Sequence, residues 1–146
     1  IKAGDFRDPA SEEFLVRALA ERRDAIGRAY LTAVNPIADP SLNDAGVLSF
    51  RNASVDADFA KAPAGYRAVW FRFDNATTRT VRIAETQARS TRLEAPSGLP
   101  CHDGGFVKVE LSSIDGSRPS WAQPINVFFR YQQGQWQLVG LERMPS

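Results

Sequence analysis

The chain has 146 residues, of which 43% are hydrophobic and 24% are charged, and its formal net charge is +1. These values are ordinary for one globular domain, large enough to bury a core without a disulfide or a metal ion. Domains built mainly to bind nucleic acid usually carry a strong basic excess, so we expect no nucleic acid partner. We predict a single α+β domain over residues 1–146, and the start at Ile1 favours a processed chain or a domain excised from a longer one.

Cysteine and targeting signals exclude further classes. Cys101 is the only cysteine, so no internal disulfide forms, and no Cys/His spacing typical of zinc occurs. No stretch approaches the roughly 20 apolar residues that cross a bilayer, and no signal peptide is recognisable. We predict no metal, no cofactor and no membrane span. Fifteen arginines against three lysines indicate a bacterial source, while the compartment, cytoplasm or exported, stays open.

The first predicted element is a long helix. Asp8 suits the N-cap, Pro9 suits the first helical position, and Pro36 disfavours helical geometry in the residue before it. Between these signals, apolar side chains recur at spacings of three, four and seven: Leu15, Leu19, Ile26, Tyr30 and Ala33. The pattern predicts a helix over 9–34 with one apolar stripe.

Residues 36–65 have no dominant period. Proline and glycine interrupt the segment repeatedly. Within it we predict only a short strand at 47–50 and a helical turn at 56–62.

From residue 66 onward the hydrophobic period is two, which is typical of strands. The alternation continues through the last hairpin, where Gly140 predicts a bulge that returns Leu141 to the face of Trp136 and Leu138. The predicted strands cover residues 67–73, 80–93, 106–111, 125–131 and 136–141.

A helix followed by strands joined mostly by short turns favours an antiparallel sheet with the helix packed on one face. The strand around Trp70 carries large apolar groups on both faces, as does the last hairpin. We therefore expect a curved sheet, with one surface against the helix and another against a cavity or a partner.

Two segments resemble the NTF2-like (SnoaL, ketosteroid-isomerase-like) superfamily of cone-shaped α+β domains. The helix end Arg28-Ala29-Tyr30-Leu31-Thr32-Ala33-Val34-Asn35 is similar to that group's helix exits. The hairpin from Val127 through Gly134-Gln135-Trp136 to Val139 resembles its closing strand pair. The middle of the chain departs from the pattern, which leaves a cystatin-like fold, one helix wrapped by a sheet, as the alternative. Both groups include enzymes, pocket-binding proteins and assembly modules, so the resemblance implies a fold and no particular activity.

Five residues are candidates for a pocket or an interface, while catalytic residues stay unknown. Tyr30 is expected to face inward from the helix. Trp70 and Trp121 are large apolar side chains with a polar N–H, and Trp121 lies in a loop between two prolines. The last hairpin contributes Phe128 and Arg130.

Two further groups of residues could support catalysis or anion binding, but their arrangement in the sequence does not favour either role. Cys101, His102 and Asp103 combine a thiol, an imidazole and a carboxylate, but adjacent side chains on an extended chain point apart. The hairpin over 67–92 carries six arginines against Asp74 and Glu85, a basic excess that suits an anionic partner or a charge-protected edge.

The sequence thus favours a binding domain, for a small apolar molecule in the cone or for a protein partner, with a homodimer formed through the sheet. One alternative is a cofactor-free isomerase or hydratase that uses an interior carboxylate with Tyr30. Another is an accessory or dimerisation domain of a larger secreted protein.

Overall fold

A computed structural model describes residues 9–143 of the chain. The α+β class is confirmed, and the proposed cap Asp8 lies outside the described residues. A long helix α1 is followed by strands, a short helix α2 and a 3₁₀ turn η1. The elements are α1 (Pro9–Ala33), β1 (Ile37–Leu42), β2 (Val47–Asn52), α2 (Ala53–Asp56), β3 (Gly65–Phe73), β4 (Thr80–Ala88), β5 (Arg92–Glu94), β6 (Phe106–Ile114), η1 (Pro119–Ala122), β7 (Ile125–Gln132) and β8 (Gln135–Arg143).

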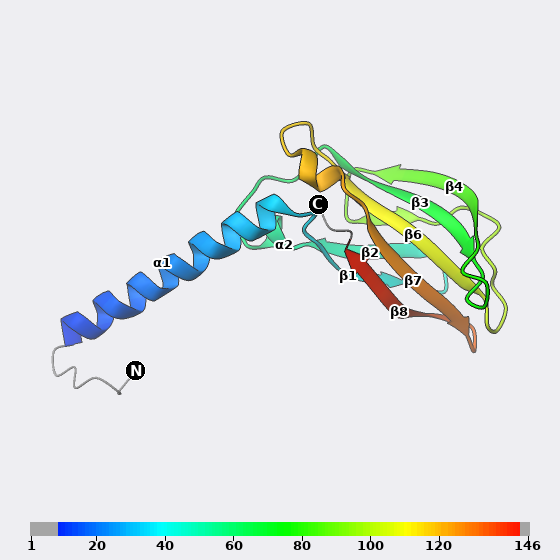
Figure 1. The fold of residues 1–146 in the computed structure, drawn as a ribbon, viewed down its shortest axis with the longest axis horizontal. Helices are drawn as coiled ribbons and strands as arrows, with labels where there is room; N and C mark the ends of the chain where they lie inside the picture. The colour runs from blue at the N-terminus through cyan, green and yellow to red at the C-terminus, as the bar shows by residue number, and fades with distance from the viewer. Residues whose placement is uncertain (1–8, 144–146) are drawn as a thin grey trace.

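The strands form two antiparallel sheets. The large sheet has five strands in the order β4-β3-β6-β7-β8, and the small sheet has three in the order β1-β2-β5. Figure 1 shows the large sheet curved, with the small sheet lying across its inner side. The predicted curved antiparallel sheet is confirmed, and a second sheet covers part of it.

Segment 36–65 contains more structure than the sequence predicts. Strand β1 was not expected, because Asp39 and Pro40 interrupt its apolar pattern. The pairing of β1 with β2 is irregular at this point, between Ala38 and Ser41, and Asp39 has a φ of 51°. The helical turn lies at Ala53–Asp56, earlier than the predicted 56–62.

The predicted strand over 80–93 is two strands in different sheets. Thr80–Ala88 pairs with β3 in the large sheet, while Arg92–Glu94 pairs with β2 in the small one. The chain therefore leaves the large sheet after β4 and turns inward. Leu93 is buried as a result, at 1% exposure.

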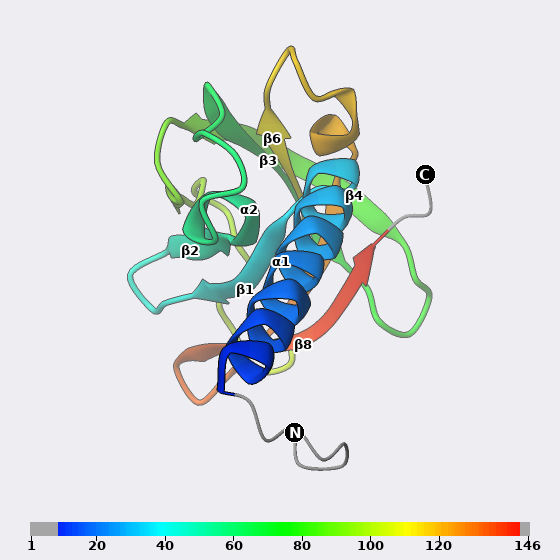
Figure 2. The ribbon, with the colours of Figure 1, turned by 90° about the vertical axis from the view of Figure 1, so that its left-hand side faces the viewer.

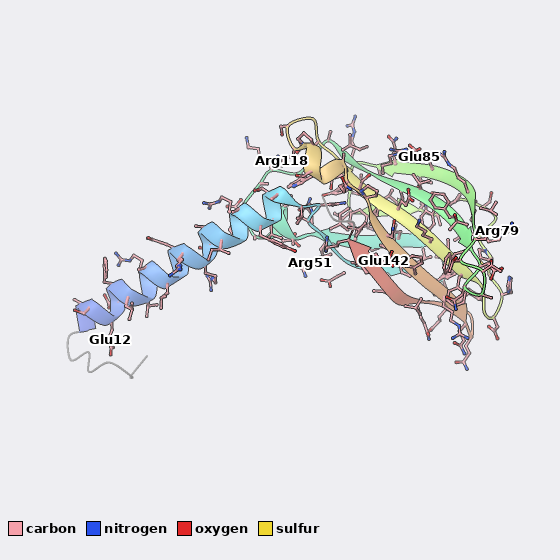
Figure 3. All side chains as sticks on the ribbon, viewed as in Figure 1. Glu12, Arg51, Arg79, Glu85, Arg118 and Glu142 are labelled. Carbon is pink, nitrogen blue, oxygen red and sulfur yellow. The ribbon has the colours of Figure 1, made fainter. Side chains whose placement is uncertain are left out.

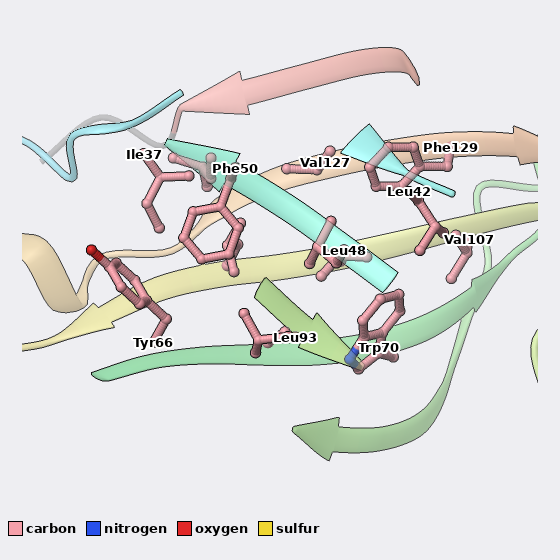
Figure 4. Packing of buried hydrophobic residues seen from close by; sticks show 14 of the residues in the cluster. Ile37, Leu42, Leu48, Phe50, Tyr66, Trp70, Leu93, Val107, Val127 and Phe129 are labelled. Atoms are coloured by element: carbon pink, nitrogen blue, oxygen red, sulfur yellow. The ribbon is translucent and has the colours of Figure 1, made fainter. Parts of the chain in front are cut away.

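The core lies between the two sheets (Figure 4). Side chains of the small sheet pack onto the inner face of the large sheet and fill the space where a hollow cone was expected. The largest side chains of this cluster with under 2% exposure are Trp70, Phe129, Ile37, Leu48, Leu93, Leu111 and Ile125.

The last hairpin matches its prediction. A register shift between Phe128 and Phe129 marks the bulge, with Gly140 opposite Phe128. Leu141 then pairs with Val127 and joins the inner face, as the sequence indicated.

Helix α1 packs against the body through its C-terminal turns, at α2 and η1. A Cβ at Gly27 would lie 3.0 Å from the ring of Phe59, so glycine permits this close approach. The hydroxyl of Ser120 in η1 donates to the carbonyl of Thr32 at 3.2 Å. The contact between α1 and the body therefore involves fewer turns of the helix than its apolar stripe predicts. Figures 1 and 2 show the rest of α1 extending away from the sheets.

The exit from α1 is anchored by buried polar contacts. The side-chain amide of Asn35 donates to the carbonyls of Leu111 and Gln123, at 3.0 and 2.9 Å. Arg143 of β8 donates to the carbonyls of Asn35 and Ile37, both at 2.7 Å. These bonds fix the direction in which the helix leaves the body.

Asn52→Ala is expected to lower the free energy of unfolding by about 2 kcal/mol. The buried Asn52 side chain accepts from the amides of Ser54 and Val55, which caps α2, and donates to the Tyr66 hydroxyl at 3.1 Å. Urea unfolding measures the loss, and Tyr66→Phe, which removes only the last bond, should cost about half as much. Wild-type stability in Asn52→Ala would contradict this account.

Candidate functional site

Two of the five candidate residues are buried. Trp70 of β3 has 0% exposure, and its indole N–H donates to the Thr86 hydroxyl at 2.8 Å. Trp121 of η1 also has 0% exposure, and the Arg118 guanidinium lies 4.8 Å from its ring centroid. Neither indole offers a surface to a ligand, so both act in packing.

Phe128 and Arg130 lie on the outer face of the large sheet, the face turned away from the small sheet. Phe128 contacts Phe73 edge to face, with 5.2 Å between ring centroids, and Phe73 lies 6.3 Å from Phe106. The Arg130 guanidinium lies 5.8 Å from the Phe106 ring. These side chains are partly buried by one another, which explains the apolar groups on both faces of β3 and β7.

Tyr30 is on α1 and is 59% exposed. It belongs to the α1 stripe, the name we give to Leu15, Leu19, Ile26 and Tyr30. Leu19, Ile26 and Tyr30 are 47%, 62% and 59% exposed, and Leu15 is partly exposed. An apolar surface of this kind on a long helix is unusual without something to cover it.

The side of α1 that meets the body is not the stripe. Gly27 and Arg28 contact Phe59, with the Arg28 guanidinium 5.3 Å from the ring centroid. Asp24 and Leu31, one turn away on the same side, are partly buried. Because 3.6 residues make one turn, Asp24 and Arg28 lie nearly opposite Leu15 and Leu19, while Gly27 lies about 80° around the helix from Leu19. The α1 stripe therefore faces solvent along its whole length.

The core contains no acid that could act as a general base. None of the Asp and Glu side chains within residues 9–143 is buried. Glu110 lies on the outer face and pairs with Lys108 at 3.2 Å. Burial raises the pKa of Tyr66, whose hydroxyl accepts from Asn52. The hydrogen-bond partner of Tyr66 is thus an amide, and the charge of the exposed Asp56 carboxylate raises the pKa of Tyr66 further.

The Cys101-His102-Asp103 loop is exposed and does not form a catalytic pair. The His102 imidazole Nδ1 lies 3.3 Å from the carbonyl oxygen of Asp103. No hydrogen bond joins that imidazole to the Cys101 thiol among the described residues. The sequence indicated that the side chains of these adjacent residues point apart, and this geometry agrees with it.

Two of the hairpin arginines and this loop meet at one end of the large sheet. Arg72 and Arg79 flank the turn between β3 and β4, and His102 lies across from them. Figure 3 shows Arg79 at the end of the molecule opposite α1. The residues that bring the two segments together are Phe73 and Phe106, which are directly paired between β3 and β6.

The described part of the chain offers neither a metal site nor a membrane-spanning helix. Residues 9–143 hold no group of three or more His, Cys, Asp or Glu side chains that could bind a metal ion. No helix in this range combines the length and the apolar character needed to cross a membrane.

No protein-family model, curated protein or solved structure matches this chain. The resemblance to NTF2-like and cystatin-like domains therefore stays a prediction. Two surface features remain as candidates for function, the α1 stripe and the cluster of Arg72, Arg79 and His102 at the opposite end of the molecule.

Proposed function

We propose that this chain is an assembly domain that pairs with a second copy of itself through the α1 stripe. The observation that supports this is the position of the stripe, which is exposed and lies away from the side of α1 that meets the body. None of residues 10–23 is buried. Helices in proteins gain most of their stability from packing an apolar face against other elements, so a partner that covers the stripe would stabilise α1.

The charges along the stripe favour a second copy in antiparallel orientation. Glu12 precedes Leu15 by three residues, and Arg22 follows Leu19 by three. When Leu15 of one chain lies opposite Leu19 of the other, Glu12 lies opposite Arg22 at both ends of the contact. A parallel pair in register would instead place Glu12 on Glu12 and Arg22 on Arg22. Around Leu15 and Leu19 the charges of the helix are thus complementary in this antiparallel alignment and repulsive in the parallel pair in register.

This interface differs from the sheet-mediated dimer that the sequence favoured. The inner face of the large sheet is covered by β1, β2 and β5. The same covering fills the cone in which a small apolar ligand was expected. The isomerase alternative lacks support as well, since it needs an interior carboxylate and an inward Tyr30. An assembly role accounts best for the surface that is left exposed.

Sedimentation equilibrium over a range of protein concentrations tests the proposal. We expect the wild-type chain to form a dimer of twice its 16.1 kDa mass. Leu19→Glu should weaken the dimer at least about 100-fold, because each dimer loses two buried leucines and gains two buried charges. Arg17→Glu is the matched control, since it places the same side chain on the opposite side of the helix.

Two results would contradict the proposal. One is a wild-type chain that stays monomeric at every concentration. The other is a Leu19→Glu variant that dimerises as tightly as Arg17→Glu. Circular dichroism and urea unfolding of both variants establish that the sheets remain folded.

A further inference from the structure

The end of the molecule opposite α1 contains a groove of about 580 Å³ that the assembly proposal does not use. One side is the turn between β3 and β4, and the other is the loop that leads into β6. The groove is lined by Arg72, Phe73, Asp74, Asn75, Ala76, Arg79, Val81, Pro100, His102, Gly104, Gly105 and Phe106. Its volume lies within the range of small-molecule sites.

The loop side of the groove is held in place by backbone hydrogen bonds. The Gly104 amide donates to the carbonyl of Tyr131 at 3.0 Å, and the Tyr131 amide donates to Gly105 at 2.8 Å. The Asp103 carboxylate accepts from the Gln133 amide at 3.0 Å. A Cβ at Gly105 would lie 2.1 Å from the Pro100 carbonyl oxygen, so only glycine fits there. This wall is therefore preformed.

The turn side is also fixed. The Asp74 carboxylate accepts from the amides of Ala76 and Thr77 at 2.9 and 3.4 Å, and the Asp74 amide donates to the backbone carbonyl of Arg79 at 2.9 Å. The hydrogen bond from Ala76 is the main reason that the pKa of Asp74 lies below its ordinary value. The one acidic side chain among the groove residues is thus hydrogen-bonded within the turn, and the nearby charge of Arg79 also contributes to lowering its pKa.

The two arginines of the groove differ from Arg67 and Arg82 of the same hairpin in their ion pairs. Arg67 and Arg82 both pair with Glu85, at 2.9 and 3.2 Å. By contrast, neither Arg72 nor Arg79 forms an ion pair with an acidic side chain within residues 9–143. An arginine that lacks such a partner beside an apolar wall can bind a carboxylate or a phosphate through two N–H groups.

The groove also has an apolar wall. Val81 pairs with Arg72 across β3 and β4, lies on the same face of the sheet and is 57% exposed. Pro100 is buried at the base of the loop. An inorganic ion would use the arginines and leave this wall bare.

We propose that this groove binds a small organic anion, whose apolar body lies on Val81 beside the loop at Pro100 and whose carboxylate or phosphate is bound by Arg72 and Arg79. The site is independent of the α1 stripe, which lies at the other end of the molecule. The arginine excess of the hairpin and the histidine loop, separate in the sequence, form one surface here.

Titrations followed by ¹H–¹⁵N NMR test the proposal with four probes. The probes are 1-naphthoate, 1-naphthyl phosphate, the uncharged 1-naphthalenemethanol, and inorganic phosphate. We expect both naphthyl anions to shift the amide signals of Ala76, Gly104 and Gly105, and to bind at least about tenfold more tightly than the alcohol or inorganic phosphate. The stronger of the two anions identifies the preferred head group.

The double variant Arg72→Gln/Arg79→Gln should bind the preferred anion at least about tenfold more weakly than the wild type. Arg89→Gln is the matched control, because Arg89 is an exposed arginine of the same hairpin that does not line the groove. Equal binding of anion and alcohol, shifts confined to other residues, or an equal loss in Arg89→Gln would overturn the proposal. Tighter binding of a hexaglutamate peptide than of either naphthyl anion, with shifts of the same amide signals, would also overturn it. That result would indicate that the groove binds an acidic protein segment instead.

Discussion

Glu12→Arg and Arg22→Glu are each expected to weaken dimerisation by about tenfold or more, and the double variant is expected to restore it. In the antiparallel pair each dimer contains two Glu12–Arg22 contacts, so one substitution turns two attractions into two repulsions. Exposed pairs contribute up to about 1 kcal/mol each, and the reversal of two pairs gives the expected change. Sedimentation equilibrium of the three variants measures it.

The same series separates the two orientations of the helices. In a parallel pair each single substitution would replace one like-charge contact with another and leave the affinity nearly unchanged. Glu13→Arg controls for the loss of an acidic residue near the N-terminus of α1, where Glu12 in the first turn also interacts with the helix dipole. Glu13 lies on the other side of the helix, so its reversal should leave the dimer intact. Two neutral single substitutions would exclude the antiparallel alignment.

The elements with complete local signals were predicted closely. Helix α1 ends at Ala33 against a predicted 34, because Pro36 and the apolar spacing act within a few residues. The last hairpin was predicted down to its bulge at Gly140, since alternation and turn residues are local as well. A local sequence pattern does not show which distant strands pair with one another.

The division into two sheets shows this limit. Strand β2 pairs with β5 through Val47 and Glu94, far apart in the sequence, and β5 has only three residues. A strand so short has no period to detect. The sequence therefore predicted one sheet with a hollow cone, where Leu93 and its neighbours close the inner side.

The sequence indicated which residues could belong to a functional surface, but not where these residues lie in the folded chain. The stripe on α1 was recognised from its spacing, but amphipathicity does not say whether a sheet or another chain covers it. Arg72 and Arg79 were part of the predicted basic excess, and His102 belonged to a separate loop. Only the register that pairs Phe73 with Phe106 places these side chains around one groove.

Trp70→Ala is expected to have the largest effect on stability, a loss of about 3–5 kcal/mol in the free energy of unfolding. Trp70 has 0% exposure and lies in the cluster that joins the two sheets, near Leu48 and Leu93 (Figure 4). Its removal leaves a cavity at this junction and the Thr86 hydroxyl without its donor. A domain of this size has a stability of about 5–15 kcal/mol, so the variant should be close to unfolding.

Urea unfolding followed by far-UV circular dichroism measures the loss, in a Leu19→Glu background so that dimerisation adds nothing to the stability. Phe71→Ala is the matched control, because Phe71 is the next residue on β3 but lies on the outer face and is partly exposed. It should cost no more than about half as much, since a partly exposed ring buries less apolar area. If the two variants lose equal stability, the contact between the sheets is not the core of this fold, and the small sheet would be a peripheral addition.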